Sequence, residues 1–188
     1  YAEPNFVYRA IVPEKTMTLE SMMAPVMEFG APSDPKFGQL WGLNNDGTNE
    51  PSRTMAGVVG ADIDAFKAWE ITKGSRSGKI AVIDTGIDYR HPDLAANMMV
   101  NEAELNGTAG VDDDGNGFVD DIYGYDFAGK DGDPMDGHSH GTHCAGTIGA
   151  IHDNGEGVAG VMSEVSFLAV KFLSDSGSGS TADAISAI

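Results

Sequence analysis

KIAVIDTG, at residues 79–86, is a short apolar run that ends in an aspartate, a threonine and a glycine. Its length and its lack of alternation with polar residues predict a buried strand of a parallel sheet. A second run of this kind, SFLAVKFL at residues 166–173, predicts a neighbouring strand. Residues 142–151 and 182–188 carry small and apolar side chains at helical spacing. This alternation predicts an α/β fold with a central, mostly parallel sheet.

Two further segments lie ahead of the first strand. Residues 62–70 have apolar side chains at helical spacing, with Ile63, Phe66 and Trp69 on one face and an aspartate near the start as a cap. Residues 74–78 read as a turn that precedes the strand. They do not match a phosphate-binding loop, which needs another glycine spacing and a position after a strand.

The composition limits the choice of partners. The 188 residues include 29 acidic and 11 Lys and Arg side chains, so the formal net charge is −18. Such a surface repels nucleic acid and anionic membranes, and no apolar run reaches the length of a membrane span. The single cysteine, Cys144, excludes an internal disulfide. A first residue other than Met and a last predicted helix that ends with the chain suggest a processed or partial chain.

Asp84 follows the first strand, where functional side chains often lie in α/β folds. A buried carboxylate needs a hydrogen-bonding or cationic partner, unless Asp84 only caps a helix or a turn. The stretch GHSHGTHCAGT, residues 137–147, contains three of the five histidines. That cluster fits a zinc site, a catalytic base or a solvated loop. An aspartate that orients one imidazole nitrogen leaves the other free as a base, so we predict that one histidine contacts Asp84.

The region 101–136 is acidic and rich in glycine, and it is too long for a bare connection. Within it, DDDGNGFVDD at residues 112–121 resembles the first part of an EF-hand loop, with Tyr123 where that loop has its glutamate. A solvated acidic turn is the alternative. The spacing predicts a calcium site formed by side chains and one carbonyl, from Asp112, Asp114, Asn116, Phe118 and Asp121.

Two motifs now point to a family. DTGID at residues 84–88 and HGTHCAGT at residues 140–147 resemble the signatures that carry the catalytic aspartate and histidine of subtilisin-like serine proteases. Further segments that fit the family are HPDL at 91–94, GVAGV at 157–161, AVKFL at 169–173 and SGSG at 176–179. The resemblance covers about residues 33–188, and Cys144 beside the histidine is similar to the thermitase-like branch. It implies the first half of a three-layer subtilisin-like fold.

The resemblance also implies roles for individual residues. Asp84 would orient the imidazole and His140 would act as general base. The nucleophilic serine of the family, in a Gly-Thr-Ser-Met-Ala motif, and its oxyanion asparagine have no match in the sequence. The extended segment Gly177, Ser178 and Gly179 would bind the backbone of a peptide substrate.

A second calcium site is implied by the resemblance alone. It would join an N-terminal arm to the loop that follows the helix of His140. Its implied ligands are Asp34, Asp93, Ile151, Asn154, Glu156 and Val158. Calcium is thus the expected cofactor at two places.

The resemblance divides the chain near Gly30. Residues 1–30 would be the end of an inhibitory propeptide and a linker, and residues 31–188 the N-terminal part of the peptidase domain. Expected partners are a peptide or protein substrate, the propeptide itself and the remaining C-terminal half of the domain. The expected location is secreted, or a vesicular or vacuolar lumen. The alternatives are a catalytically inactive subtilase-like subunit or structural protein, and a zinc metallohydrolase using His138, His140 and His143.

Overall fold

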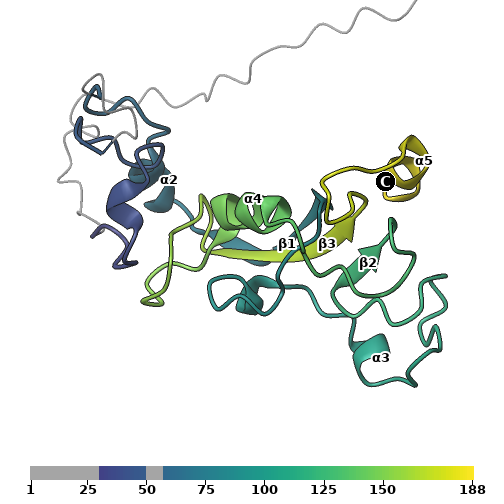
Figure 1. Cartoon of the computed structure of the whole chain (residues 1–188). Helices are drawn as coiled ribbons and strands as arrows, with labels where there is room; N and C mark the ends of the chain where they lie inside the picture. Colours follow the sequence, from purple (N-terminus) through teal and green to yellow (C-terminus); the bar gives the residue numbers. More distant parts are fainter. Residues whose placement is uncertain (1–29, 50–56) are drawn as a thin grey trace, which may run out of the picture.

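The computed structural model describes residues 30–49 and 57–188. Residues 1–29 of the expected propeptide remnant and linker therefore lie outside the described residues. The elements follow in this order: η1 (Phe37–Gln39), α2 (Ala65–Trp69), β1 (Gly74–Asp84), η2 (Ala95–Asn97), α3 (Glu102–Leu105), β2 (Gly124–Asp126), α4 (His140–Gly149), β3 (Glu164–Lys171) and α5 (Thr181–Ser186) (Figure 1).

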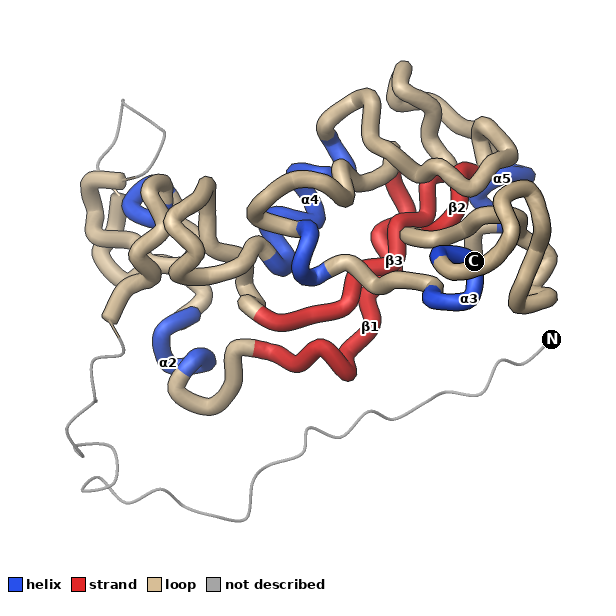
Figure 2. Tube along the Cα trace, turned by 90° about the horizontal axis from the view of Figure 1, so that it is seen from below, coloured by secondary structure: helices blue, strands red, loops and turns tan. Residues whose placement is uncertain are grey.

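The three strands form one parallel sheet in the order β1-β3-β2. Asp84 of β1 and Asp126 of β2 are both level with Lys171 of β3, so the three strands end at one edge of the sheet. Helix α4 lies across one face of β1 and β3 (Figures 1 and 2). The predicted α/β fold with a mostly parallel sheet is confirmed.

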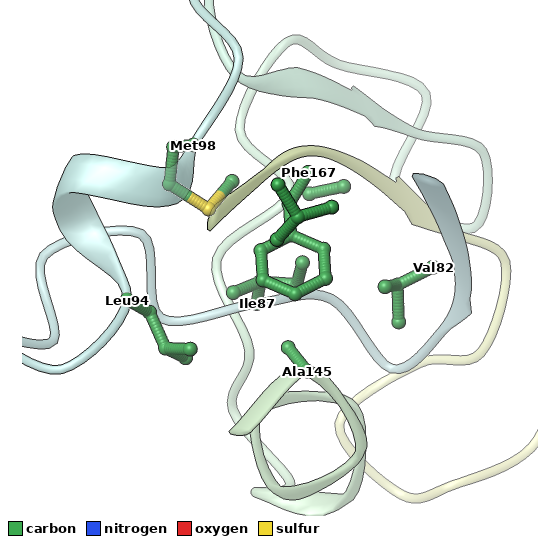
Figure 3. Packing of buried hydrophobic residues seen from close by; sticks show 8 residues of the cluster. Val82, Ile87, Leu94, Met98, Ala145 and Phe167 are labelled. Atoms are coloured by element: carbon green, nitrogen blue, oxygen red, sulfur yellow. The ribbon is translucent and has the colours of Figure 1, made fainter. Parts of the chain in front are cut away.

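The main core lies between α4 and the sheet. Phe167 at the centre of β3 is fully buried, and Ile87, Leu94 and Ala145 surround it (Figure 3). Burying such a phenylalanine stabilises the fold by about 2–3 kcal/mol. Small residues let α4 approach closely, because a Cβ atom on Gly149 would stand 2.6 Å from Cγ1 of Val165. Gly149 of the histidine helix is therefore a packing requirement.

A second cluster joins the N-terminal arm to the loop after α4. Phe37, Trp69 and Ala159 belong to it, and the Trp69 indole N–H donates to the carbonyl of Val161 at 2.8 Å. This hydrogen bond spans 92 positions in the chain and holds α2 against the loop, and Phe37 of the arm packs against Trp69. The cluster places Asp34 beside the loop 151–158.

The predicted first strand is correct in place but wrong in extent and burial. It begins at Gly74, which pairs with Glu164, so the turn predicted for residues 74–78 is wrong. An irregularity between Gly74 and Lys79 explains why this part has no strand-like sequence. Val82 is buried, but the Ile83 side chain is 39% exposed. In the described sheet β1 is an edge strand, so its outer side has no covering neighbour.

The helix predicted for residues 62–70 is also shorter than expected. It begins at Ala65, and Asp64 takes a left-handed conformation without capping the helix through its side chain. The Asp62 carboxylate instead accepts hydrogen bonds from the backbone N–H groups of Asn45 and Asp64, both at 2.8 Å. Ile63 then lies outside the helix and is exposed. The aspartate shapes the loop before the helix instead of capping it.

Candidate active site

Asp84 and His140 meet at the edge of the sheet, as the sequence predicts. Asp84 is the last residue of β1 and His140 is the first of α4. Nδ1 of His140 lies 2.8 and 2.9 Å from the two carboxylate oxygens of Asp84. The Asp84 side chain is mostly buried and the imidazole is 60% exposed. In the described part of the chain Nε2 has no hydrogen-bond partner, so it is free to exchange a proton with a substrate or a nucleophile.

Two glycines allow the strand end and the helix start to come together. A Cβ atom on Gly141 would lie 2.1 Å from the carbonyl oxygen of Gly86 and 3.2 Å from Cβ of Asp84. Gly86 itself has φ +104°, a conformation that favours glycine. The Thr85 hydroxyl accepts the backbone N–H of Gly141 at 3.0 Å. Thr85, Gly86 and Gly141 thus allow Asp84 and His140 to come into contact.

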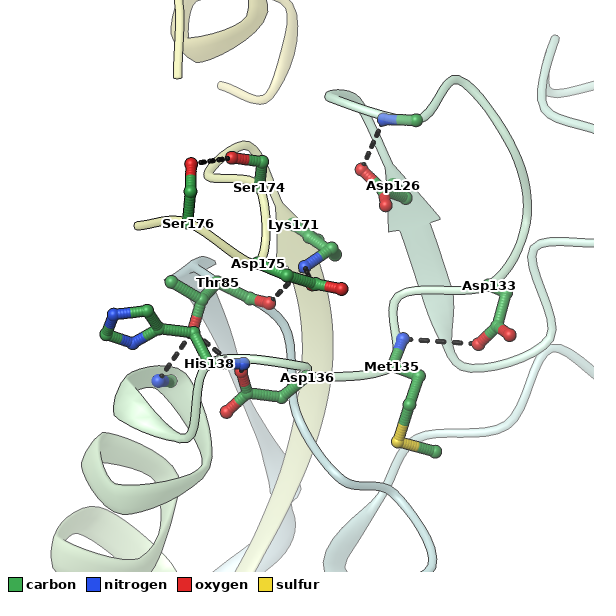
Figure 4. Close-up of polar contacts among 12 residues, drawn as sticks. Thr85, Asp126, Asp133, Met135, Asp136, His138, Lys171, Ser174, Asp175 and Ser176 are labelled. Atoms are coloured by element: carbon green, nitrogen blue, oxygen red, sulfur yellow. Dashed lines mark hydrogen bonds and ion pairs between the residues drawn. The ribbon is translucent and has the colours of Figure 1, made fainter. Parts of the chain in front are cut away.

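Asp136 organises the start of α4, and the sequence reasoning missed it. Its carboxylate accepts from the N–H groups of His138, Ser139 and Thr142 and from the hydroxyls of Thr142 and Thr85, at 2.6–2.9 Å. Asp136 lies beside Thr85 and His138 in Figure 4. Burial alone would raise the pKa of Asp136, but these hydrogen bonds outweigh it and lower the pKa. The signal in the sequence is an aspartate at the N-terminal side of a helix. Its reach to Thr85 depends on the fold.

Cys144 lies one helical turn after His140, with Sγ 3.8 Å from Nδ1 of the imidazole. Partial burial and the nearby charges of Asp84 and Asp136 raise the pKa of this thiol. The thiol therefore stays protonated at neutral pH, whereas only the deprotonated thiolate is a good nucleophile. The geometry agrees with the expectation that Cys144 is a helix residue and not a nucleophile.

The zinc alternative finds no support in the described residues. His138 and His140 have ring centroids 6.4 Å apart, and His140 is occupied at Nδ1 by Asp84. The metal-sized cluster around His140 consists of Asp84, His140 and Cys144, without the other two histidines. The three histidines of residues 138–143 therefore do not act as one ligand set.

The segment expected to bind substrate backbone follows β3. Gly177 has φ +74° and lies in a turn, so the prediction of an extended segment is wrong at that residue. The turn closes because the Gly177 N–H donates to the carbonyl of Ser174 at 2.8 Å and the Ser174 N–H donates to that of Ser178 at 2.9 Å. A Cβ on Gly179 would stand 2.3 Å from the carbonyl oxygen of Phe172, so this glycine is required by the close packing.

The acidic loop brings most of its predicted ligands together. The Asn116 side-chain amide donates to Asp114 and Asp121, and the Asn101 amide donates to the same two carboxylates, all within 3.2 Å. Burial raises the pKa of Asp121, and the Asn101 hydrogen bond lowers that of Asp114. Asp112 accepts the N–H groups of Gly115, Asn116 and Gly117. Phe118 donates its N–H to Asn116, and its ring packs against Tyr125.

Glu104 belongs to this cluster and was not predicted. It is only 4% exposed, and its carboxylate oxygens accept the N–H groups of Asp113, Asp114 and Asp120. Carboxylate oxygens of Glu104, Asp112 and Asp114 all lie within 4.8 Å of one another. Converging anions of this kind fit a hard divalent cation. Only the fold brings Glu104 here from a separate short helix, α3.

The residues implied for the second calcium site also converge. Asp34 and Asp93 are 4% and 2% exposed, although both are charged. Asp93 accepts the Asn154 side-chain amide and the Val158 N–H at 2.9 Å, and its carbonyl accepts the Ile151 N–H. Asp34 accepts the N–H groups of Asp153 and Asn154. The Glu156 N–H donates to the side-chain oxygen of Asn154. Among the described residues neither carboxylate contacts a cationic side chain, and two such buried carboxylates fit a cation between the arm and the loop.

A family model, described as the Subtilase family, matches residues 75–188, which include both Asp84 and His140. The chain belongs to the subtilase family. The prediction made from the two motifs is confirmed. The matched range also contains Gly86 and Gly141, which bring β1 and α4 together, so the subtilase match includes every residue of the contact between Asp84 and His140.

Curated relatives are subtilases of several organisms. Subtilisin-like protease 1 of Plasmodium berghei (strain Anka) is 47% identical over 115 residues, which are 61% of this chain and 19% of that protein. Thermitase of Thermoactinomyces vulgaris is 38% identical over 117 residues, 62% of this chain and 33% of thermitase. This subtilase chain therefore spans between about a fifth and a third of these relatives.

Solved structures agree on the fold. A serine protease of Aeromonas sobria, solved as a complex with a chaperone, superposes with a TM-score of 0.58 at 23% identity, over 84% of this chain and 23% of that one. A protease of Pseudoalteromonas arctica superposes with a TM-score of 0.53 at 26% identity, over 82% of this chain and 42% of the other. Within residues 30–49 and 57–188 of the subtilase chain, no helix is long and apolar enough to cross a membrane.

Proposed function

We propose that this chain is the N-terminal part of the catalytic domain of a calcium-stabilised serine endopeptidase. The observation that carries the proposal is the contact of His140 Nδ1 with both carboxylate oxygens of Asp84, at 2.8 and 2.9 Å. This contact leaves Nε2 available as general base toward a serine hydroxyl. The serine and the oxyanion asparagine would come from sequence outside these 188 residues, so the chain by itself would not hydrolyse peptides.

In the complete protein, each residue of the site has a separate task. Asp84 fixes the tautomer of His140 and stabilises the imidazolium that forms when His140 removes the serine proton. The serine oxygen attacks the scissile carbonyl, and His140 then gives the proton to the leaving amine. Asp136 and Gly141 hold the helix start in the place that this exchange requires. Residues 177–179 would bind the backbone of the peptide.

We also propose calcium as the cofactor at the two acidic clusters. Asp112, Asp114, Asn116, Phe118, Asp121 and the additional Glu104 would hold one ion, and Asp34, Asp93, Ile151, Asn154, Glu156 and Val158 the other. A bound ion supplies positive charge that offsets the repulsion among these carboxylates. The ion binds the folded state, so it stabilises the domain by mass action.

The proposed partners and location follow from the same assignment. A peptide or protein is the substrate, residues 1–30 are the end of an inhibitory propeptide, and the C-terminal half of the domain completes the site. A secreted, vesicular or vacuolar location fits a protease that calcium stabilises.

A serine-directed fluorophosphonate probe tests the proposed activity. The full-length protein is expected to react covalently with the probe, and His140→Ala is expected to slow labelling by at least about a thousandfold, because the general base is lost. Cys144→Ala should label at a rate similar to the wild type, since the thiol is not the nucleophile. A full-length protein that folds but is not labelled would instead be an inactive subtilase-like subunit.

A further inference from the structure

Lys171 is a buried ammonium group beside the active site. It is the last residue of β3 and is 4% exposed. Its Nζ donates to the carbonyl oxygen of Thr85 at 2.6 Å and to Oδ1 of Asp175 at 2.7 Å (Figure 4). A buried ammonium is unfavourable unless it is well paired, so both contacts matter to its position. One of these partners directly follows Asp84 and the other belongs to the loop after β3.

Asp175 joins that loop to the segment that enters α4. Its carboxylate lies against the backbone of Gly137 and also accepts a hydrogen bond from the ammonium of Lys171. A Cβ atom on Gly137 would stand 2.3 Å from Cγ of Asp175, so the two segments touch closely. Gly137 is three residues before His140. One exposed carboxylate thus contacts both a buried cation and the backbone just ahead of the general base.

A second contact joins the same two segments. A Cβ atom on Gly177 would stand 3.1 Å from Nε2 of His138, so the imidazole of His138 lies against the turn of the loop. The turn is closed within itself by Ser174, which donates from both its N–H and its hydroxyl to the carbonyl of Ser178. A change in the place of Asp175 would therefore move residues 174–179 as one unit.

Backbone hydrogen bonds alone do not fix this loop. The N–H groups of Phe172 and Leu173 both donate to the carbonyl of Asp84, at 3.0 and 3.1 Å, and they hold the strand end. Beyond Leu173, the ion pair of Lys171 and Asp175 joins the side chains of the loop back to the strands. The Lys171 hydrogen bond lowers the pKa of Asp175, so this carboxylate stays charged at neutral pH.

We propose that Lys171, acting through Asp175, is a positioning residue that sets where the substrate-binding loop 174–179 lies relative to Asp84 and His140. The proposal rests on the proposed peptidase function for its effect on substrate. Binding energy from a peptide that pairs with the loop is useful only if the scissile bond then lies beside His140. The ion pair supplies that alignment by joining the loop to both catalytic segments.

Asp175→Ala in the full-length protein tests the proposal, because Asp175 is exposed and its loss should not prevent folding. For a peptide long enough to reach residues 177–179, KM should rise about fivefold, because the loop loses its ion pair with Lys171 and no longer aligns the peptide with His140. For a single-residue ester, which does not reach the loop, both kcat and KM should stay within about twofold. Lys171→Met should give the same split, and the double variant should add little to either single change.

Lys67→Met is the matched control, because it breaks an exposed ion pair with Asp64 at 2.9 Å on α2. It should leave both substrates unaffected. Equal losses for peptide and ester, or no rise in KM for the peptide, would show that the pair does not position the loop.

Amide hydrogen exchange over residues 172–180 gives a readout that does not need activity. Asp175→Ala should speed exchange in this segment by about fivefold while the β3 amides stay protected. Unchanged exchange would overturn the positioning role. A wild-type protein that hydrolyses neither substrate would refute the proposed function, and the exchange measurement would still decide whether the pair holds the loop.

Discussion

Asp136 shows how much one side chain can contribute to a site without touching a substrate. It accepts hydrogen bonds from three backbone N–H groups ahead of and within the first turn of α4, and from two threonine hydroxyls. Helix starts leave such N–H groups without partners, and a carboxylate there also interacts favourably with the helix dipole. Since the Thr85 hydroxyl belongs to the strand side, the same carboxylate joins α4 to the residue after Asp84.

We expect Asp136→Ala to lower the free energy of unfolding by about 2 kcal/mol, because several donors lose a charged acceptor. Asp136→Asn keeps the size of the side chain and should cost about half as much. Urea unfolding at pH 7 measures both changes. Ser176→Ala, which removes an exposed loop hydroxyl, should change stability by less than about 0.5 kcal/mol and serves as control.

The lowered pKa of Asp136 adds a test with pH. A carboxyl whose pKa is lower in the folded than in the unfolded protein stabilises the fold fully above its ordinary value of 3.8. This contribution is lost as the pH falls through the folded pKa. The difference in stability between wild type and Asp136→Asn should therefore shrink from about pH 5 to about pH 2. A difference that stays constant over this range would show that the charge of Asp136 does not contribute.

The elements show which features the sequence could predict. The strand end at Asp84 and the helix that begins near His140 follow from local apolar runs and small residues, and the structure confirms both. The second strand, predicted for residues 166–173, is present but runs from Glu164 to Lys171. The first half of β1 could not be predicted, because Gly74 becomes part of a strand only by pairing with Glu164, 90 residues away. Glu104 was missed for a related reason, because the N–H groups that it binds come from a later loop. For Asp136 only the contact with Thr85 depends on another segment of the chain.

The contact between α4 and β1 depends on Gly141, and this dependence can be tested within one helix. In Gly141→Ala the new Cβ would meet the Gly86 carbonyl at 2.1 Å, so the helix start must move away from Asp84. We expect a loss of about 1–3 kcal/mol in stability, as for other overpacked sites. Labelling by the fluorophosphonate probe should slow at least tenfold, since His140 moves with the helix.

Gly146→Ala is the control on the same helix. A Cβ there would meet nothing within 4 Å outside the helix's own backbone. Alanine is the better helix former, so this change should stabilise the helix by up to about 1 kcal/mol. If both alanine variants had the same effect on stability and labelling, close approach at Gly141 would not be what holds the two catalytic candidates together.

At the scale of the whole molecule, the negative charge is not spread evenly. The −18 net charge includes two groups of carboxylates that the fold buries or brings within a few ångströms of one another. One group lies in the acidic loop around Glu104, and the other joins the N-terminal arm to the loop after α4. The arm is also held by the cluster around Phe37 and Trp69. Cation binding there would add to apolar packing that is already present.

Removal of calcium tests this arrangement in the intact protein. An ion present at 100 times its dissociation constant stabilises the fold by about 2.7 kcal/mol, so excess chelator should lower the melting temperature by about 8 °C for each such site in a domain of this size. Asp93→Asn and Asp114→Asn should each remove part of the calcium-dependent shift, because each removes one charge from one cluster. Asp183→Asn, which changes an exposed carboxylate on α5, should keep the whole shift.

Magnesium at the same concentration should restore less of the melting temperature than calcium does, since magnesium prefers a smaller, octahedral site. Identical melting curves with calcium and with chelator would refute the calcium proposal. The repulsion within the two carboxylate groups would then be offset by the apolar core alone.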